Sequence, residues 1–126
     1  MTAILGSYRD PVAFRPERFN PVLLAAGAHM KAVLTCLEPG QFIPVHKPGV
    51  DMVLVVLDGV GQIAAGHTQE AVHPGSVVFV TAGEDRGLKA ETRLVALHVV
   101  SPPPAEKDHL EVMRKLKQGK WQNEEL

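Results

Sequence analysis

Short apolar runs alternate with turn-forming residues along most of the chain. Beyond Lys31 the runs are rich in Val, Ile and Leu, and segments such as "EPG", "HKPG" and "HPG" separate them. Runs of this kind are typical of β-strands, and turns this frequent leave no room for crossover helices. The pattern predicts an all-β fold of mainly antiparallel strands that close into a sandwich or a small barrel. The predicted strands are "KAVLTCL", "QFIPV", "DMVLVVL", "VGQIAA", "QEAV", "SVVFV" and "TRLVALHVV".

Some of these runs are apolar on both faces instead of alternating. Met52 to Leu57 and Val95 to Val100 are the longest examples. Strands of this type are covered on both sides in folded proteins. The cover is expected to come either from the two ends of the chain or from another subunit, and we therefore predict a homodimer.

The residues before the first strand favour an extended arm. The stretch "YRDPVAFRPERFNP", residues 8–21, carries three prolines and alternates arginine with aromatic residues. Proline at this density is incompatible with a helix. We predict an N-terminal arm over residues 1–30, held to the body of the protein by Phe14 and Phe19.

The residues after "SPPP" favour a helix from Ala105 to Lys117. Acidic residues near its start and basic residues near its end suit the helix dipole. Leu110, Met113 and Leu116 are spaced by three and predict a narrow apolar stripe that docks on the sheet. The polar tail that follows is expected to be mobile unless Trp121 docks. Residues 105–126 are thus a helix and tail attached to a barrel of residues 31–104, in a single domain.

Composition removes several classes of partner. The 126 residues include thirteen Lys and Arg against fourteen Asp and Glu, with no basic stripe, so nucleic acid is not an expected partner. No apolar run approaches the roughly 18 to 20 residues of a membrane span, and the N-terminus lacks the features of a signal peptide. We expect a soluble, cytoplasmic protein. The single Cys36 lies in an apolar run and is predicted to pack as a small hydrophobe.

Two glycine-based frames follow one another along the predicted strands. The first is Gly40, five residues, His46, and then a closing turn at residues 58–59; the second is Gly75, five residues, and then residues 81–83, which are Thr, Ala and Gly. The pair resembles the two motifs of the cupin family, G(x)5HxH(x)3-4E(x)6G and G(x)5PxG(x)2H(x)3N. The resemblance covers Lys31 to Pro104 and implies a double-stranded β-helix, or jelly-roll barrel, with the arm and the helix attached.

The metal-binding positions of these motifs are changed in this chain. In cupins the metal is held by two His and a Glu of the first motif and by the His of the second. Here the first of these positions is His46, the second is Pro48, the third is Met52, and the fourth is Arg86. Divalent Zn, Mn or Fe sites use several N or O ligands, and a cationic guanidinium repels such an ion. Asp51 is one residue from the Glu position, and only a bulge would turn it inward.

A cavity with a few polar groups is what these substitutions leave. We predict that His46, Met52, Arg86 and His98 line it, with Phe42 and Phe79 as further apolar lining. Lys47 is an additional candidate. Arg86 suggests an anionic ligand, because guanidinium matches a carboxylate or phosphate; the alternative is a solvated loop residue paired with Glu84 or Asp85. His98 shares a strand face with Leu94, Ala96 and Val100, and the other four histidines are expected at the surface.

Three functions compete on this evidence. The interpretation we favour is a metal-depleted cupin that binds a small anionic molecule in the barrel without a cofactor. The alternative is a metal-dependent cupin enzyme, an oxygenase, isomerase or lyase acting on a small organic acid, in which His46, Asp51 and His98 hold Zn, Fe, Mn or Ni. The third is metal-free catalysis, with His46 as general base and Arg86 stabilising an oxyanion.

Overall fold

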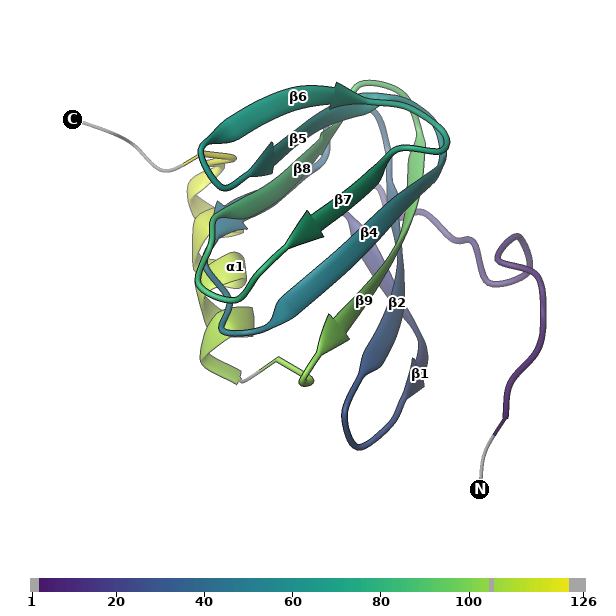
Figure 1. Ribbon diagram of the computed structural model, residues 1–126. Helices are drawn as coiled ribbons and strands as arrows, with labels where there is room; N and C mark the ends of the chain where they lie inside the picture. Colours follow the sequence, from purple (N-terminus) through teal and green to yellow (C-terminus); the bar gives the residue numbers. More distant parts are fainter. Residues whose placement is uncertain (1–2, 105, 123–126) are drawn as a thin grey trace.

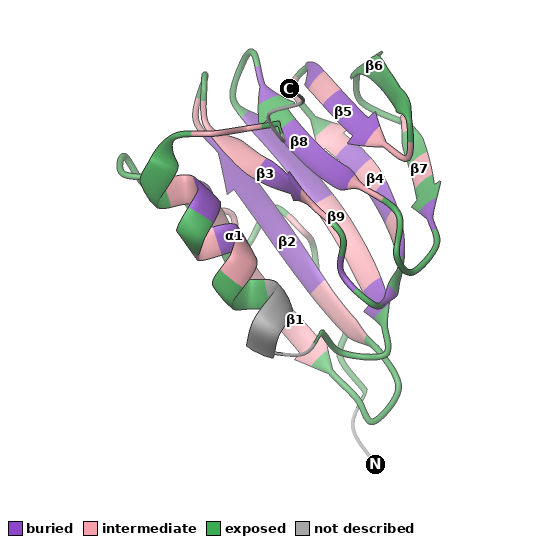
Figure 2. Ribbon diagram, turned by 90° about the vertical axis from the view of Figure 1, so that its left-hand side faces the viewer, coloured by how far each residue is buried: buried purple, intermediate pink, exposed green. Residues whose placement is uncertain are grey.

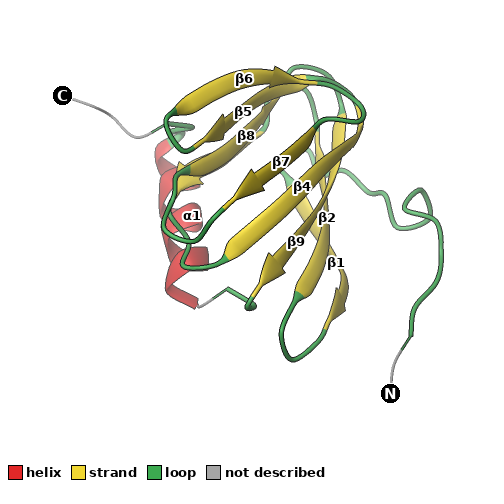
Figure 3. Cartoon of the chain, in the orientation of Figure 1, coloured by secondary structure: helices red, strands yellow, loops and turns green. Residues whose placement is uncertain are grey.

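The described part of the chain is almost entirely β-structure. The computed structural model describes residues 3–104 and 106–122, and these form nine strands and one helix (Figures 1 and 3). The strands are β1 (Asn20–Ala26), β2 (Lys31–Leu37), β3 (Phe42–His46), β4 (Asp51–Asp58), β5 (Gly61–Ala65), β6 (Thr68–Val72), β7 (Val77–Val80), β8 (Arg86–Ala90) and β9 (Leu94–Ser101). The helix is α1 (Glu106–Gln118). Within these residues no helix is long and apolar enough to cross a membrane.

The strands form two facing sheets in which every strand pair is antiparallel. Over the described residues, the larger sheet has the order β1-β2-β9-β4-β7 and the smaller sheet the order β3-β8-β5-β6. Strands distant in sequence are neighbours, since β9 lies between β2 and β4 and β8 lies between β3 and β5. This interleaving is the double-stranded β-helix that the motifs implied, so the predicted fold class is confirmed.

Two strands escape the sequence pattern. The segment interpreted as an arm over residues 1–30 contains β1, which pairs with β2 at the edge of the larger sheet. Its Pro21 donates no ladder hydrogen bond, which is tolerated at a sheet edge. The other missed strand, β8, reads "RGLKA", and its glycine and charges conceal it. Gly87 is needed there because a Cβ would lie 2.6 Å from Cγ2 of Val45 on the neighbouring strand.

The arm before β1 covers the outer face of the larger sheet. Phe14 packs with Leu34, Cys36 and Val95 in an outer cluster, whereas Phe19 is buried in the main core between the sheets. Both aromatic residues therefore hold the arm to the body, as predicted, and Cys36 is a buried packing residue. The arm and α1 lie on opposite sides of the barrel (Figure 1).

The helix packs on the barrel through a face that differs from the predicted stripe. Val112 is buried and Leu116 packs beside it, but Leu110 is 58% exposed. At 3.6 residues per turn, the contact face passes through positions 109, 112, 113 and 116, and position 110 falls outside it. The predicted start at Ala105 lies outside the described residues. Exposed residues gather on the outward face of α1 and along β6 and β7 (Figure 2).

The segment after α1 docks as far as the structure describes it. The carbonyl of Trp121 accepts a hydrogen bond of 2.6 Å from the backbone N–H of Val45 on β3. The Trp121 ring lies 5.8 Å from Nζ of Lys89. The sequence predicted a mobile tail unless Trp121 docks, and Trp121 does dock. Residues 123–126 lie outside the described residues.

Glycine is required at turns that the sequence had marked. Gly59, Gly66 and Gly75 adopt φ values of 80°, 61° and 94°. These lie in the left-handed region that residues with a Cβ rarely adopt. The turns that set the strand register therefore follow directly from local sequence.

Candidate functional site

A cavity of about 570 Å³ occupies one end of the barrel. Register relations define its depth. On the larger sheet, Lys31, Val100 and Met52 form one level across β2, β9 and β4. The next level inward contains Val33, His98 and Leu54. We call these the mouth level and the middle level.

The opposite end of the barrel is filled. Leu37, Leu94, Ala96 and Val56 continue the same inward faces, are fully buried and do not line the cavity. Ala90 of β8 joins them from the smaller sheet. These residues form the floor of the cavity.

The four cupin metal positions converge at the mouth. His46, Pro48, Met52 and Arg86 all line the cavity, although they come from three strands and a loop. His46 and Arg86 are direct partners across β3 and β8. The motif alignment therefore placed these positions correctly, and their side chains determine what the site can hold.

His46 is held in one tautomer by its own strand. Its Nδ1 lies 2.7 Å from the carbonyl oxygen of Pro44, which can only accept, so Nδ1 carries the proton. Burial lowers the pKa of His46; the bond to Pro44 and the carboxylate of Glu111 oppose this, and Arg86 and Lys115 add to it. In the neutral ring Nε2 is consequently an acceptor.

His98 is a neutral group of the middle level. Its Nδ1 lies 3.5 Å from Oγ1 of the buried Thr35. Burial, with the positive charges of Lys31 and Arg86 and a contribution from His46, lowers the pKa of His98 to about 4. His98 faces the cavity. Its position on an inward strand face had predicted this location.

Arg86 is a buried residue rather than a solvated loop residue. It is 4% exposed, and its Nη2 donates to the carbonyl oxygens of Val50 at 2.6 Å and Thr81 at 3.1 Å. Its carbon stem and head lie at the level where β4 begins and β7 ends. The alternative of a surface Arg paired with Glu84 or Asp85 is therefore wrong, because Arg86 begins a strand whose first side chain points inward.

Several sequence candidates lie outside the cavity. Asp51 is exposed, and its Oδ1 accepts a 2.9 Å hydrogen bond from the backbone N–H of Ala82. Lys47 is exposed as well. Phe79 is 69% exposed, because its neighbours in β7 take the inward positions, and Phe42 alternates with the lining residue Ile43. The predictions that Phe42 and Phe79 line the cavity are wrong. Asp51 points away from the cavity, as expected for a strand position one residue from the motif position without a bulge.

Sequence reasoning missed a group of basic residues that line the cavity. Lys31 of β2, Arg15 and Arg18 of the arm, and His109 of α1 all line the cavity. Lys31 carried a signal, since it shares an inward face with Val33 two residues later. Arg15, Arg18 and His109 carried no such signal, because the way in which the arm and the helix pack around the cavity decides their position.

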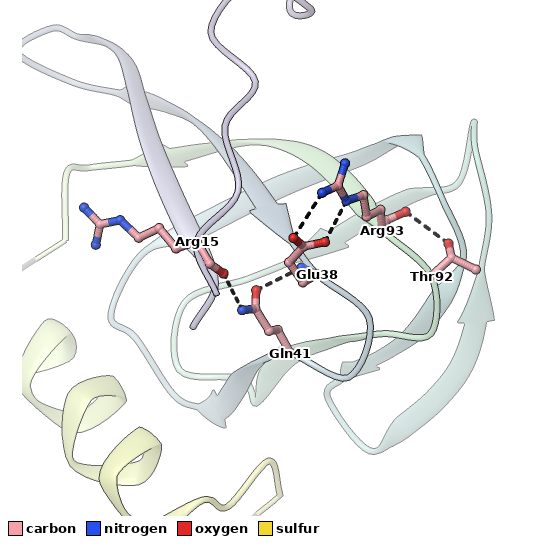
Figure 4. A network of polar contacts seen from close by, with 5 residues as sticks. All are labelled: Arg15, Glu38, Gln41, Thr92 and Arg93. Atoms are coloured by element: carbon pink, nitrogen blue, oxygen red, sulfur yellow. Dashed lines mark hydrogen bonds and ion pairs between the residues drawn. The ribbon is translucent and has the colours of Figure 1, made fainter. Parts of the chain in front are cut away.

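A polar network holds the arm at the closed end of the barrel (Figure 4). The side chain of Gln41 donates to the carbonyl of Arg15 at 2.6 Å and accepts from the backbone N–H of Glu38 at 2.9 Å. Glu38 also receives two hydrogen bonds from Arg93, whose guanidinium lies 4.5 Å from the Phe14 ring. The Arg15 side chain points away from this network (Figure 4), leaving its charge at the cavity.

The fixed charges in the described lining of the cavity are all positive, and the carboxylate of Glu111 acts on His46 from beyond that lining. The described lining includes Arg15, Arg18, Lys31 and Arg86, together with His46, His98 and His109. No Asp or Glu belongs to that described lining. A concave site with this balance attracts anions, because low-dielectric walls strengthen the field of fixed charges.

Comparison with solved structures identifies the architecture. The chain superposes on protein TT1209 of Thermus thermophilus with a TM-score of 0.74 at 26% identity, covering 78% of this chain and 96% of that one. An RmlC-like cupin from Desulfovibrio desulfuricans gives 0.73 at 24% identity, with coverages of 81% and 99%. The chain has the fold of these small cupin proteins. A double-stranded β-helix domain protein of Klebsiella pneumoniae also matches it, with a TM-score of 0.73 at 17% identity and coverages of 80% and 91%.

The sequence itself matches no family model and no curated protein. The similarity to these solved structures therefore concerns the fold.

The residues at the mouth of the barrel do not fit the metal site of the cupin motif. Pro48 has no donor, Met52 offers a soft thioether, and Arg86 is a buried cation beside His46. Among the described residues, no group of three or more His, Cys, Asp or Glu is arranged to hold a metal ion. His46 and His98 approach one another, but Asp51 is directed elsewhere, so the alternative ligand set is not assembled.

Proposed function

We propose that this cupin is a metal-depleted binding protein that takes a small anionic molecule in its barrel cavity. The observation that carries the proposal is the positive charge around the cavity, with Arg86 replacing a metal ligand. A volume of about 570 Å³ suits a small molecule. The second metal-binding position of the motif, a histidine in cupins, is Pro48 here. The pair of histidines on which a cupin metal depends is therefore absent.

Lys31 offers the sharpest test of anion binding. Calorimetric titration would use hexanoate, gluconate, succinate and inorganic phosphate, with 1-hexanol as the neutral control. Lys31→Met should lower the affinity for the best anion about tenfold, because a cation at the mouth level is lost. The matched control is Lys47→Met, since Lys47 lies at the same end of the barrel but outside the cavity.

Two results would overturn anion binding. One is that none of the four anions binds the wild-type protein. The other is that Lys31→Met and Lys47→Met weaken binding equally, which would mean that only the overall charge of the protein matters.

Elemental analysis distinguishes the enzyme alternative from a metal-depleted site. We expect untagged protein, purified without chelator, to carry far less than one equivalent of Zn, Fe, Mn or Ni. One equivalent per chain that disappears in His46→Ala would overturn the proposal and support a metal-dependent enzyme with an unusual ligand set.

We also propose that two copies of the chain associate through an outer apolar patch. The patch consists of Val53, Val55, Val77, Phe79 and Val99, which are partners across β7, β4 and β9. Val77 and Phe79 are 67% and 69% exposed, and the arm covers the other half of this sheet face. A face without charge can meet its own copy across a two-fold axis.

Sedimentation of wild type and Phe79→Lys tests this association. The wild type should be a dimer at micromolar concentration, and the variant a folded monomer, because a lysine would have to be buried in the interface. A monomeric wild type would contradict the proposal, as would a variant that remains dimeric.

A further inference from the structure

We propose that the ligand is an amphipathic carboxylate, with its charged head at the mouth level and an apolar body that extends towards the floor. This inference rests on the proposed function and specifies the class of anion. It separates hydrocarbon or aromatic acids from sugar acids and other polyhydroxylated anions.

Two cations and an imidazole lie at the outer end of the cavity. Lys31 belongs to the mouth level, and Arg86 is fixed to the same height by its hydrogen bonds to Val50, just before β4, and to Thr81, just after β7. His46 is the strand partner of Arg86. A carboxylate at the mouth thus lies beside two cations and an imidazole.

The wall changes character one level further in. From the larger sheet the lining is Val33 and Leu54; from the smaller sheet it is Ile43, Leu88 and Ile63, which are partners across β3, β8 and β5. These side chains carry no hydrogen-bonding groups. An apolar ligand body gains free energy here by leaving water, in proportion to the area that it buries.

The polar groups of the inner cavity are already occupied or neutral. His98 is next to Thr35, and its lowered pKa leaves it uncharged near neutral pH. Backbone N–H and C=O groups at this depth belong to the sheet ladders. Ligand hydroxyls placed among these walls would lose their hydrogen bonds to water without replacement, which is costly.

The dimensions suit a body of moderate length. From Met52 at the mouth to Val56 at the floor, β4 advances about 13 Å at 3.3 Å per residue. This depth accommodates an extended chain of about six to eight carbon atoms, including the carboxylate at the mouth. The volume of about 570 Å³ also leaves room for a ring.

Two six-carbon acids provide a matched comparison. Hexanoate and gluconate have the same carboxylate and the same number of carbons, and differ in the hydroxyl groups of the body. Calorimetry on the wild-type protein should show hexanoate binding at least about tenfold more tightly than gluconate. Equal or tighter binding of gluconate overturns this inference while anion binding stands.

Other outcomes separate this inference from the proposed function. If 1-hexanol binds as tightly as hexanoate, the cavity recognises only an apolar body and the proposed anion site fails. If neither six-carbon acid binds but succinate or phosphate does, this inference fails and anion binding stands; if none of the four anions binds, both proposals fail.

A hydroxyl placed on the wall provides a second, independent test. Val33→Thr keeps the shape of a middle-level residue but makes it polar, and should weaken hexanoate about fivefold by reducing the gain from apolar burial. Val60→Thr makes the same change in the turn between β4 and β5, outside both the cavity and the outer apolar patch, and should leave hexanoate binding unaltered. Unchanged binding in a folded Val33→Thr protein would show that the body does not contact the middle level, and would overturn the inference.

Discussion

The two ends of the barrel are built from the same strands and differ in what fills them. Along β2, β9 and β4 the inward positions run from Lys31, Val100 and Met52 at the open end to Leu37, Leu94 and Val56 at the closed end. The closed end is packed without exposed surface, whereas the open end keeps a cavity of about 570 Å³. Because the same strands run through both ends, packing at the closed end also holds the strands in place at the open end.

This difference separates stability from function within single strands. Residues at the floor contribute buried apolar area and are replaceable only by residues of similar volume. Residues at the mouth include Lys31, His46 and Arg86. Burying such polar or charged side chains costs free energy. Arg86 also fastens the segments at Val50 and Thr81 through its hydrogen bonds, whereas Lys31 has no such role among these contacts and is the residue on which the proposed anion site mainly rests.

The largest expected difference between the two ends concerns loss of volume. Leu94→Ala at the floor should lower the free energy of unfolding by about 3 kcal/mol, because its neighbours cannot close the space. Leu54→Ala should cost less, since Leu54 already faces the cavity. Urea denaturation of both variants measures the difference. A larger cost for Leu54→Ala would contradict the contrast between a packed and an open end.

The second-largest expected effect is a loss of stability in acid, which arises at the open end of the barrel. The folded protein holds His98 neutral with a pKa of about 4, among Lys31, Arg86 and His46, while the unfolded chain protonates it near pH 6.5. The unfolded state therefore binds more protons, and stability falls as the pH drops from about 6.5 to about 4, on the order of 1 to 3 kcal/mol.

Urea midpoints at pH 7 and pH 4.5 measure this dependence. His98→Gln should lose much less stability than wild type over the interval, and the exposed His67→Gln is the control. If His98→Gln and wild type lose the same stability, His98 is not the group responsible.

The smallest effect, and the sharpest comparison, comes from adding one methylene at each end. Val33→Ile fills part of the open cavity and should stabilise the protein by about 0.5 kcal/mol while weakening hexanoate binding. Val56→Ile adds the same group to the packed floor and should destabilise by about 1 kcal/mol through overpacking. Thermal unfolding detects both signs. Destabilisation by Val33→Ile would indicate that the middle level is packed as tightly as the floor.

Much of the fold was accessible from local patterns. The predicted strands from "KAVLTCL" to "TRLVALHVV" correspond to β2 to β7 and β9, and the helix was found. The missed strands show the limit. In β8, Gly87 is dictated by the close approach of Val45, a residue 42 positions earlier, so no local pattern reveals it.

The candidate site divides in the same way. The motif frames placed His46, Pro48, Met52 and Arg86 together, because the spacing between turns fixes which strand positions meet. Phe42 and Phe79 were assigned to the wrong face, since both faces of their strands are apolar in sequence. In such strands the pattern does not define which side points inward.

By itself, the sequence determined the turns, the strand lengths and the loss of the cupin metal ligands, because these depend on residue type and spacing within short segments. Tertiary structure alone decided that Arg86 is buried, that Lys31, Arg15 and Arg18 line one cavity, and that His98 stays neutral. These properties arise when segments distant in the chain enclose a common space, where burial and neighbouring charges set the energies of groups that appear ordinary in the sequence.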